Sequence, residues 1–270
     1  MGAMVFATRL FQRLAFSAAA ALLLAACGSG GAGEGATSVS AGLPPAPAVA
    51  ADTTILFMGN SHTSGNDVPG IVAAMLRAGV PTKSVATTTS PDWMLLNERG
   101  NHEPSLALIA SQRWKFVVLQ AQDYSSSGQF VYPTTGAEKL VRLSRSQGAV
   151  PILFAEWPRR GIAETQRILD VYASVAVKEP ACLPPIPQAF DAAAARHPDI
   201  TLYASDGNHS APPGAFLAAL VIYATVSGSD PGTLPSLTIA GVDADTQFKL
   251  RVVAADTLRT FPAKKWCPGD

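Results

Sequence analysis

The stretch "ILFMGNSHTSGND", residues 55–67, decides the fold, because a run of apolar residues ends abruptly in small and polar ones. Its apolar part belongs to the segment "TTILFM" (53–58), which predicts a buried strand. A helix is predicted directly afterwards, over residues 68–78. A strand that stops here presents Ser61 at its carboxyl-terminal tip, where a nucleophile could stand.

Downstream, short apolar runs alternate with amphipathic stretches, and no internal repeat is visible. Strands are predicted at 83–89, 115–120, 149–157 and 200–204, and helices at 105–112, 137–147, 162–178, 188–196, 213–226 and 243–261. This alternation predicts a three-layer α/β/α sandwich with a parallel sheet covered on both faces. Ligands of such sheets bind beyond the carboxyl ends of the strands. Ser61, Gln122 and the pair Asp206 and His209 each follow a predicted strand, so we expect them on one rim.

The N-terminal segment carries the features of an export signal. Arg9 and Arg13 precede an uncharged apolar run that ends at Cys27 and is too short to cross a bilayer. The sequence "LAAC" (24–27) resembles a bacterial lipobox, which implies residues 1–27 as a lipoprotein signal and a lipid on Cys27. An ordinary signal peptide with an incidental cysteine remains an alternative. Gly28 after the cysteine favours the periplasmic face of the outer membrane within the cell envelope.

Composition separates a tether from a folded domain. Residues 28–52 are rich in Gly, Ser, Pro and Ala, which predicts a disordered tether, and 53–270 are predicted to fold. Twenty basic and twenty acidic residues cancel, so nothing suggests a nucleic-acid partner. Apart from Cys27, only Cys182 and Cys267 remain. They could form a disulfide in an oxidising compartment, or stay as two free thiols.

A serine nucleophile needs a base and a group that orients the base. Of the four histidines, His209 in "ASDGNHSAPPG" (204–214) is the best candidate. Asp206, three residues earlier, can accept a hydrogen bond from Nδ1 and leave Nε2 free to take the serine proton. His62 is expected to point away from the site, because adjacent residues on a tight turn diverge. His102 is expected in a solvated loop.

The block Gly59-Asn60-Ser61, together with Asp206-Gly207-Asn208-His209, resembles the SGNH (GDSL-type) hydrolase superfamily. The resemblance spans residues 53–230 and implies a flavodoxin-like sandwich and a triad of Ser61, His209 and Asp206. The family's third block corresponds to "VVLQAQD" (117–123). It places Gln120 at the Gly position, Gln122 at the position of the oxyanion-binding Asn, and Asp123 at the Asp position.

The family's second block, a glycine whose N–H binds the oxyanion, has no counterpart near residues 91–93. The N–H of Asp92 or Trp93 could substitute and act with the N–H of Ser61 and the amide of Gln122. Asn60 is a further candidate binding residue, as are Gln120 and Asp123 in the third block. Trp157 either shapes the pocket or packs in the core.

No His, Cys or carboxylate spacing suggests a metal, and no glycine-rich loop suits a nucleotide, so no cofactor is expected. The sequence therefore predicts a membrane-tethered serine esterase, with a substrate that is an O-acylated glycan or another ester of the envelope. Two alternatives stay open. One is a catalytically inactive SGNH-fold lipoprotein that binds a carbohydrate, and the other is an O-acyltransferase. Oligomeric state cannot be read from the sequence.

Overall fold

Four parallel strands form one sheet in the order β2-β1-β3-β4. The strands are β1 (Thr53–Met58), β2 (Val85–Thr89), β3 (Phe116–Gln120) and β4 (Val150–Phe154). The computed structural model describes residues 51–269. The predicted signal over 1–27, its Cys27 and nearly all of the tether lie outside the described residues. Within 51–269, no helix has both the length and the apolar character needed to cross a membrane.

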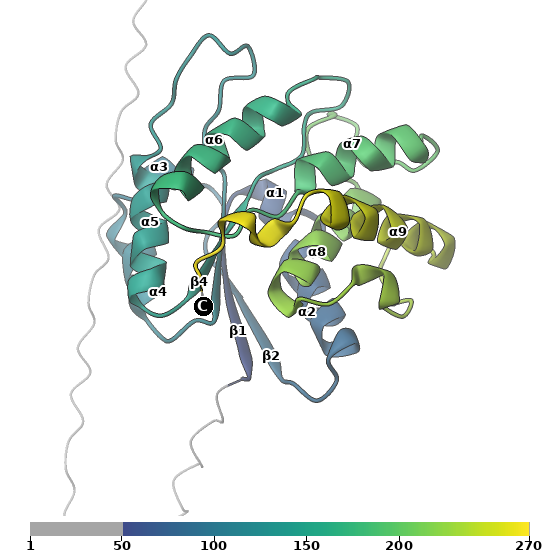
Figure 1. Cartoon of the computed structure of the whole chain (residues 1–270), viewed down its shortest axis with the longest axis horizontal. Coiled ribbons are helices and arrows are strands. Elements are labelled where there is room, and N and C mark those ends of the chain that lie inside the picture. The colour runs from purple at the N-terminus through teal and green to yellow at the C-terminus, as the bar shows by residue number, and fades with distance from the viewer. Residues whose placement is uncertain (1–50, 270) are drawn as a thin grey trace, which may run out of the picture. The chain divides into compact units, whose positions relative to one another are not determined.

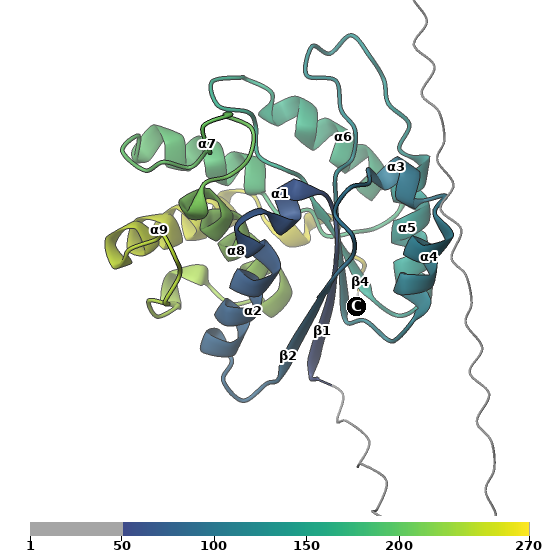
Figure 2. The same ribbon diagram turned by 180° about the vertical axis from the view of Figure 1, so that it is seen from behind.

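The two faces of the sheet are covered by different helices, as Figures 1 and 2 show from opposite sides. Ile55 and Phe57 point into one core, and Leu56 and Met58 into the other; all four are fully buried. This alternation follows from the two-residue period of a strand. The first core is closed by α2 (Val68–Gly79), α7 (Ile186–Arg196), α8 (Pro212–Ser227) and α9 (Ala244–Thr260).

The second core is closed by α3 (Leu96–Arg99), α4 (Glu103–Ala110), α5 (Thr135–Ser146) and α6 (Thr165–Lys178). The predicted three-layer α/β/α architecture is thus confirmed. The short helices were not predicted, because one turn is too brief to show a hydrophobic period. They are α3, named above, together with α1 (Ser61–Ser64), η1 (Gly65–Asp67), η2 (Pro231–Thr233) and η3 (Ala263–Trp266).

The predicted strand over 200–204 is wrong. That segment forms one isolated bridge, between Tyr203 and Ser210, and does not join the sheet. The reason is that the free edge of β4 is already occupied by Cys182. The N–H of Leu153 donates to the carbonyl of Cys182 at 2.8 Å, and the N–H of Cys182 donates to that of Pro151 at 2.9 Å.

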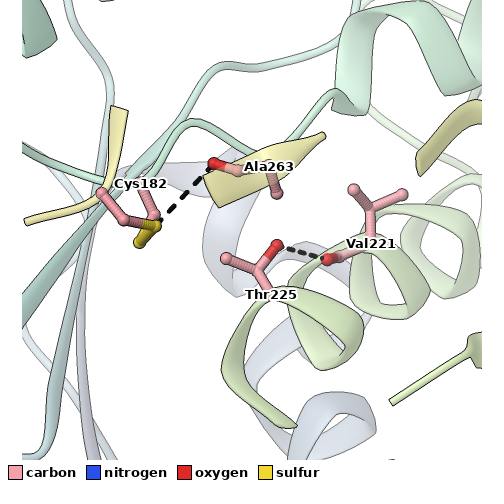
Figure 3. The surroundings of a disulfide bond; sticks show 5 residues. Cys182, Val221, Thr225 and Ala263 are labelled. Atoms are coloured by element: carbon pink, nitrogen blue, oxygen red, sulfur yellow. Dashed lines mark hydrogen bonds between the residues drawn. A yellow bond between two sulfur atoms is a disulfide. The ribbon is translucent and has the colours of Figure 1, made fainter. Parts of the chain in front are cut away.

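A disulfide joins Cys182 at this sheet edge to Cys267 in the C-terminal tail. Figure 3 shows the bond beside Ala263, which lies in η3. The N–H of Leu183 also donates to the carbonyl of Ala263 at 3.1 Å. The tail is therefore fastened to the edge of the sheet by one covalent bond and one backbone hydrogen bond.

Replacing both cysteines by serine is expected to lower the free energy of unfolding by about 2–4 kcal/mol. The reason is that the bond closes a loop with a sequence separation of 85 residues and so restricts the unfolded chain. Urea unfolding of wild type with and without dithiothreitol measures the effect. The Cys182→Ser/Cys267→Ser variant is the control and should not respond to the reductant. A wild-type midpoint that reductant leaves unchanged would contradict the prediction.

Candidate active site

Three side chains from distant parts of the chain form a continuous hydrogen-bonded line. Ser61 Oγ lies 2.8 Å from His209 Nε2, and His209 Nδ1 lies 2.6 Å from Asp206 Oδ2. Because a carboxylate can only accept, His209 donates through Nδ1–H, which leaves Nε2 to accept the hydroxyl proton of Ser61. The structure thus brings together the three residues expected to form the triad. The arrangement is that of a nucleophile, a base and an orienting acid.

Asp206 is held by its own loop as well as by His209. Its Oδ1 accepts from the N–H of Asn208 at 2.9 Å and from the N–H of His209 at 3.0 Å. Gly207 adopts a φ of 69°, a conformation that glycine allows at little cost and that lets the loop turn back on itself. The hydrogen bond from His209, followed by those two N–H groups, lowers the pKa of Asp206 to about 2. The carboxylate therefore stays charged at neutral pH.

Ser61 is positioned by the turn between β1 and α1. Gln120 at the end of β3 is almost fully buried, and its Oε1 accepts from the N–H of Asn60 and from Thr63 Oγ1, both at 2.9 Å. A Cβ on Gly59 would lie 2.5 Å from that Oε1, so only glycine fits there. Asn60 Oδ1 caps α1 by accepting from the N–H of His62 at 3.0 Å. Gln120 and Asn60, predicted as binding residues, support the nucleophile instead.

Arg99 is a supporting residue that the sequence reasoning missed. Its side chain is buried, and Nη2 donates to the carbonyl of Gly59 at 2.8 Å and also to the carbonyl of Pro91. Asp92 in the same loop accepts from Ser64 Oγ at 2.6 Å, which ties the loop to α1. No pattern in the sequence distinguishes Arg99 from a surface arginine, because the partners are carbonyls of distant segments.

The predicted oxyanion donors divide into two groups. The N–H of Ser61 carries no hydrogen bond among the described residues, and neither does that of Asp92 or Trp93. Gln122 is different, because its Nε2 donates to the carbonyls of Asp123 and Pro133 at 3.0 and 3.1 Å. Its amide therefore has no hydrogen left for an oxyanion, and that assignment is corrected.

The conformation of the chain after β3 explains the position of Gln122. Ala121 has a φ of 80°, so the chain turns sharply there, and the N–H of Gln122 donates to Tyr172 Oη at 3.0 Å. Tyr172 in turn donates to Glu156 Oε2 at 2.6 Å. Burial raises the pKa of Glu156 to about 7, and burial also raises the pKa of Asp123. No contact of Asp123 points to a binding role.

Glu156→Gln is expected to stabilise the protein at pH 8 and to change little at pH 4. The folded pKa of about 7 lies above the 4.5 of an ordinary glutamate, so the favourable contribution of the protonated acid is complete below 4.5 and disappears as pH rises through 7. The difference corresponds to about 3 kcal/mol. A glutamine keeps an oxygen for Tyr172 but carries no charge at any pH.

Urea unfolding at both pH values measures this effect. Glu138→Gln is the matched control, because Lys178 and Thr134 lower the pKa of Glu138. That variant should lose stability at pH 8, the opposite sign. Equal stability of wild type and Glu156→Gln at pH 8 would contradict the prediction.

Two further contacts connect α1 and the following η1 to the His209 loop. Asn66 Nδ2 donates to the carbonyl of Ser210 at 2.8 Å. The rings of His62 and His209 stack, with centroids 5.0 Å apart and planes inclined by 24°. His62 therefore lies against the candidate base, and the expectation that it points away is wrong.

The two tryptophans considered for the pocket have different positions. Trp157 is only 1% exposed, stacks on Phe190 with ring centroids 4.9 Å apart, and donates from Nε1 to the carbonyl of Asn208 at 2.8 Å. It therefore packs in the core beneath the His209 loop and does not bind substrate directly, which corrects its place among the binding residues. Trp93 is 70% exposed and meets the His102 ring edge to face.

No protein-family model matches the chain, and no curated protein matches it by sequence. Solved structures do match. A protein from Slackia heliotrinireducens that is assigned to the SGNH hydrolases is 28% identical, with a TM-score of 0.51 over 64% of this chain and 98% of its own. A DUF4886 family protein from Bacteroides uniformis is 14% identical, with a TM-score of 0.62 over 78% and 96% of the two chains.

A protein from Parabacteroides merdae described as a GDSL-like lipase is 16% identical, with a TM-score of 0.50 over 66% of this chain and 96% of its own. At such identities the second and third of these structures speak for the fold alone. Two of these neighbours are thus described as an SGNH hydrolase and a GDSL-like lipase. The chain therefore has the fold of the SGNH (GDSL-type) hydrolases.

Proposed function

We propose that the protein is a serine esterase in which Ser61, His209 and Asp206 form the catalytic triad. The hydrogen-bonded line from Ser61 Oγ through His209 to Asp206 carries this proposal. Ser61 Oγ attacks the acyl carbonyl while Nε2 of His209 takes its proton. His209 then returns the proton to the leaving alcohol, and an acyl-enzyme remains. Water attacks this ester with His209 again as base, and the acid is released.

The charge that develops on the carbonyl oxygen needs donors that are already in place. The N–H of Ser61 is the first, and the N–H of Asp92 or Trp93 is the second. Ser64 and Arg99 support this arrangement, because they hold the 91–93 loop against the end of β1 and α1. Asp206 stays charged and compensates the positive imidazolium that forms on His209.

For the substrate we propose a small acyl group on a bulky carrier, with an O-acylated glycan first. The side chains of His209 and Asp206 are 40% and 48% exposed, and Ser61 is exposed, so a large carrier can reach the triad. The exposed Trp93 offers a flat apolar ring and follows Asp92, which bonds Ser64 in α1. The lipobox-like "LAAC" supports a lipid anchor on Cys27 and a place in the cell envelope.

Labelling with a fluorophosphonate probe tests the esterase proposal. The probe forms a covalent bond only with an activated serine, so wild type should be labelled and Ser61→Ala should not. Ser174→Ala is the matched control, because it removes an exposed hydroxyl on α6, outside the site, and it should still be labelled. A wild type that resists the probe and does not cleave p-nitrophenyl acetate would contradict the proposal.

The same assays separate the two alternatives. The commitment of the Gln122 amide to two backbone carbonyls leaves one fewer oxyanion donor and favours a protein that binds a glycan without catalysis. If the protein only binds a glycan, the wild type should bind the glycan and should not be labelled by the fluorophosphonate probe. An acyltransferase predicts labelling together with transfer of the acyl group to a sugar rather than to water.

Trp93→Ala is expected to raise KM for an acetylated oligosaccharide about tenfold and to leave kcat/KM for p-nitrophenyl acetate within about threefold. The reason is that an exposed indole can stack on a sugar ring, an interaction on the order of 1 kcal/mol that a small ester does not need. Michaelis–Menten analysis with both esters measures it. Phe261→Ala is the control, because it removes another exposed aromatic ring, at the C-terminal end of α9. Equal losses on both esters would contradict the assignment.

A further inference from the structure

A second imidazole, that of His62, lies directly on the ring of the candidate base, His209. The ring of His62 covers one face of His209, with centroids 5.0 Å apart and planes inclined by 24°. His209 itself is held by two hydrogen bonds, through Nδ1 to Asp206 and through Nε2 to Ser61. The N–H and the lone pair of an imidazole lie in its plane, so these two bonds direct its nitrogens. They oppose displacement of the ring along its normal only weakly.

His62 is itself held from three sides. Its backbone N–H donates to Asn60 Oδ1 at 3.0 Å, and its Nδ1 lies 3.3 Å from the same oxygen. The ring of Trp157 lies 5.1 Å from it, at 45°. Trp157 also donates to the carbonyl of Asn208, the residue before His209. One buried tryptophan therefore supports both the second imidazole and the loop that carries the base.

We propose that His62 is a positioning residue that packs as a neutral ring against His209 and keeps the base aligned with Ser61. This inference rests on the proposed esterase function. The contact with the face of His209 restricts displacement of its ring along the ring normal, which its hydrogen bonds oppose only weakly. Small misplacements of a catalytic group can reduce the rate about a hundredfold. The contact therefore matters for kcat more than for substrate binding.

The charge state of His62 is part of this role. Burial, followed by the charge of His209, lowers the pKa of His62. Hydrogen bonding of His62 to Asn208, and after it the charge of Asp206, raise the pKa and are smaller. Among the described residues, the titratable groups that act on His62 are thus His209 and Asp206. A neutral His62 lets His209 accept the serine proton without a second positive charge stacked on it.

Kinetics with p-nitrophenyl acetate give the first test. His62→Ala is expected to lower kcat about 10- to 100-fold and to change KM less than about threefold. His62→Phe keeps a flat neutral ring and should retain kcat within about threefold of wild type. His197→Ala, at the C-terminal end of α7, is the matched control and should behave as wild type. A His62→Ala variant with wild-type kcat overturns the proposal, and so does a phenylalanine variant as slow as alanine.

The electrostatic coupling between the two rings gives a second test. The quantity measured is the titration midpoint of His62, which a merely structural role would not link to His209. The chain has only four histidines, so NMR can follow the titration of each ring. The midpoint of His62 should lie below 6.5 in wild type and rise in His209→Gln, where the neighbouring charge is absent. An unchanged midpoint overturns the proposal.

Failure of this inference differs from failure of the esterase function. If the fluorophosphonate probe labels wild type and His62→Ala at the same rate, only the role of His62 is lost. If the probe does not label wild type at all, the esterase function is lost and the role of His62 with it.

Discussion

Ser61→Ala and His209→Ala are each expected to lower kcat for an ester substrate about 10⁶-fold, and the double variant is expected to lose no more. The reason is that the nucleophile and the base act as one unit, so removing either abolishes the same step. In a serine protease with the same triad chemistry, each of the two single losses costs about 2 × 10⁶ in kcat. The 2.8 Å contact between Ser61 Oγ and Nε2 implies the same dependence here.

Hydrolysis of p-nitrophenyl acetate by wild type, both single variants and the double variant measures this effect as a double-mutant cycle. Ser174→Ala and His197→Ala are the matched controls, because they remove a hydroxyl on α6 and an imidazole at the end of α7, away from the site. Both should keep kcat within about tenfold. Additive losses in the double variant would show that Ser61 and His209 do not act in one step, and a loss below about tenfold in either single variant would exclude it from the triad.

Asp206→Asn is expected to lower kcat about 10⁴-fold while the protein stays folded. An asparagine can still accept from the N–H groups of Asn208 and His209, which now bond to Oδ1, so the loop keeps its shape. Its amide cannot replace a carboxylate opposite Nδ1. His209 then loses both the tautomer that leaves Nε2 free for the serine proton and the negative charge that compensates the imidazolium.

The pH dependence of Asp206 distinguishes its role from that of a general acid or base. Its pKa is lowered from 3.8 to about 2, so its contribution is present above 3.8 and is lost only as pH falls through 2. Any loss of activity between pH 5 and 7 must therefore come from another group. Asp243→Asn is the matched control, because Asp243 also has a lowered pKa but caps α9.

Steady-state kinetics and thermal unfolding of both asparagine variants make the comparison. A loss of kcat in Asp206→Asn without a change in unfolding temperature is the expected result. A variant that retains more than about a tenth of the wild-type kcat would show that Asp206 does not orient the base.

The sequence by itself determined the layers and the edge at which the site stands. The apolar runs at 53–58 and 116–120 predict strands of a covered sheet, and most of their residues are buried on its two faces. The helices between them oblige the strands to run parallel, which places Ser61 and the end of β3 on the same rim. Asp206 and His209 were found through their spacing of three residues, because that contact is local to one loop. Their catalytic roles remain predictions.

Only the tertiary structure decided which partners the polar side chains have. Cys182 takes the edge of β4 and so excludes the expected fifth strand, and the turn at Ala121 commits Gln122 to backbone carbonyls. The burial of Arg99 and the stacking of His62 on His209 depend on segments that are far apart in the chain. Periodicity and spacing express the preferences of neighbouring residues. A hydrogen bond or a ring contact between distant segments forms only when the packed core has fixed both of its ends.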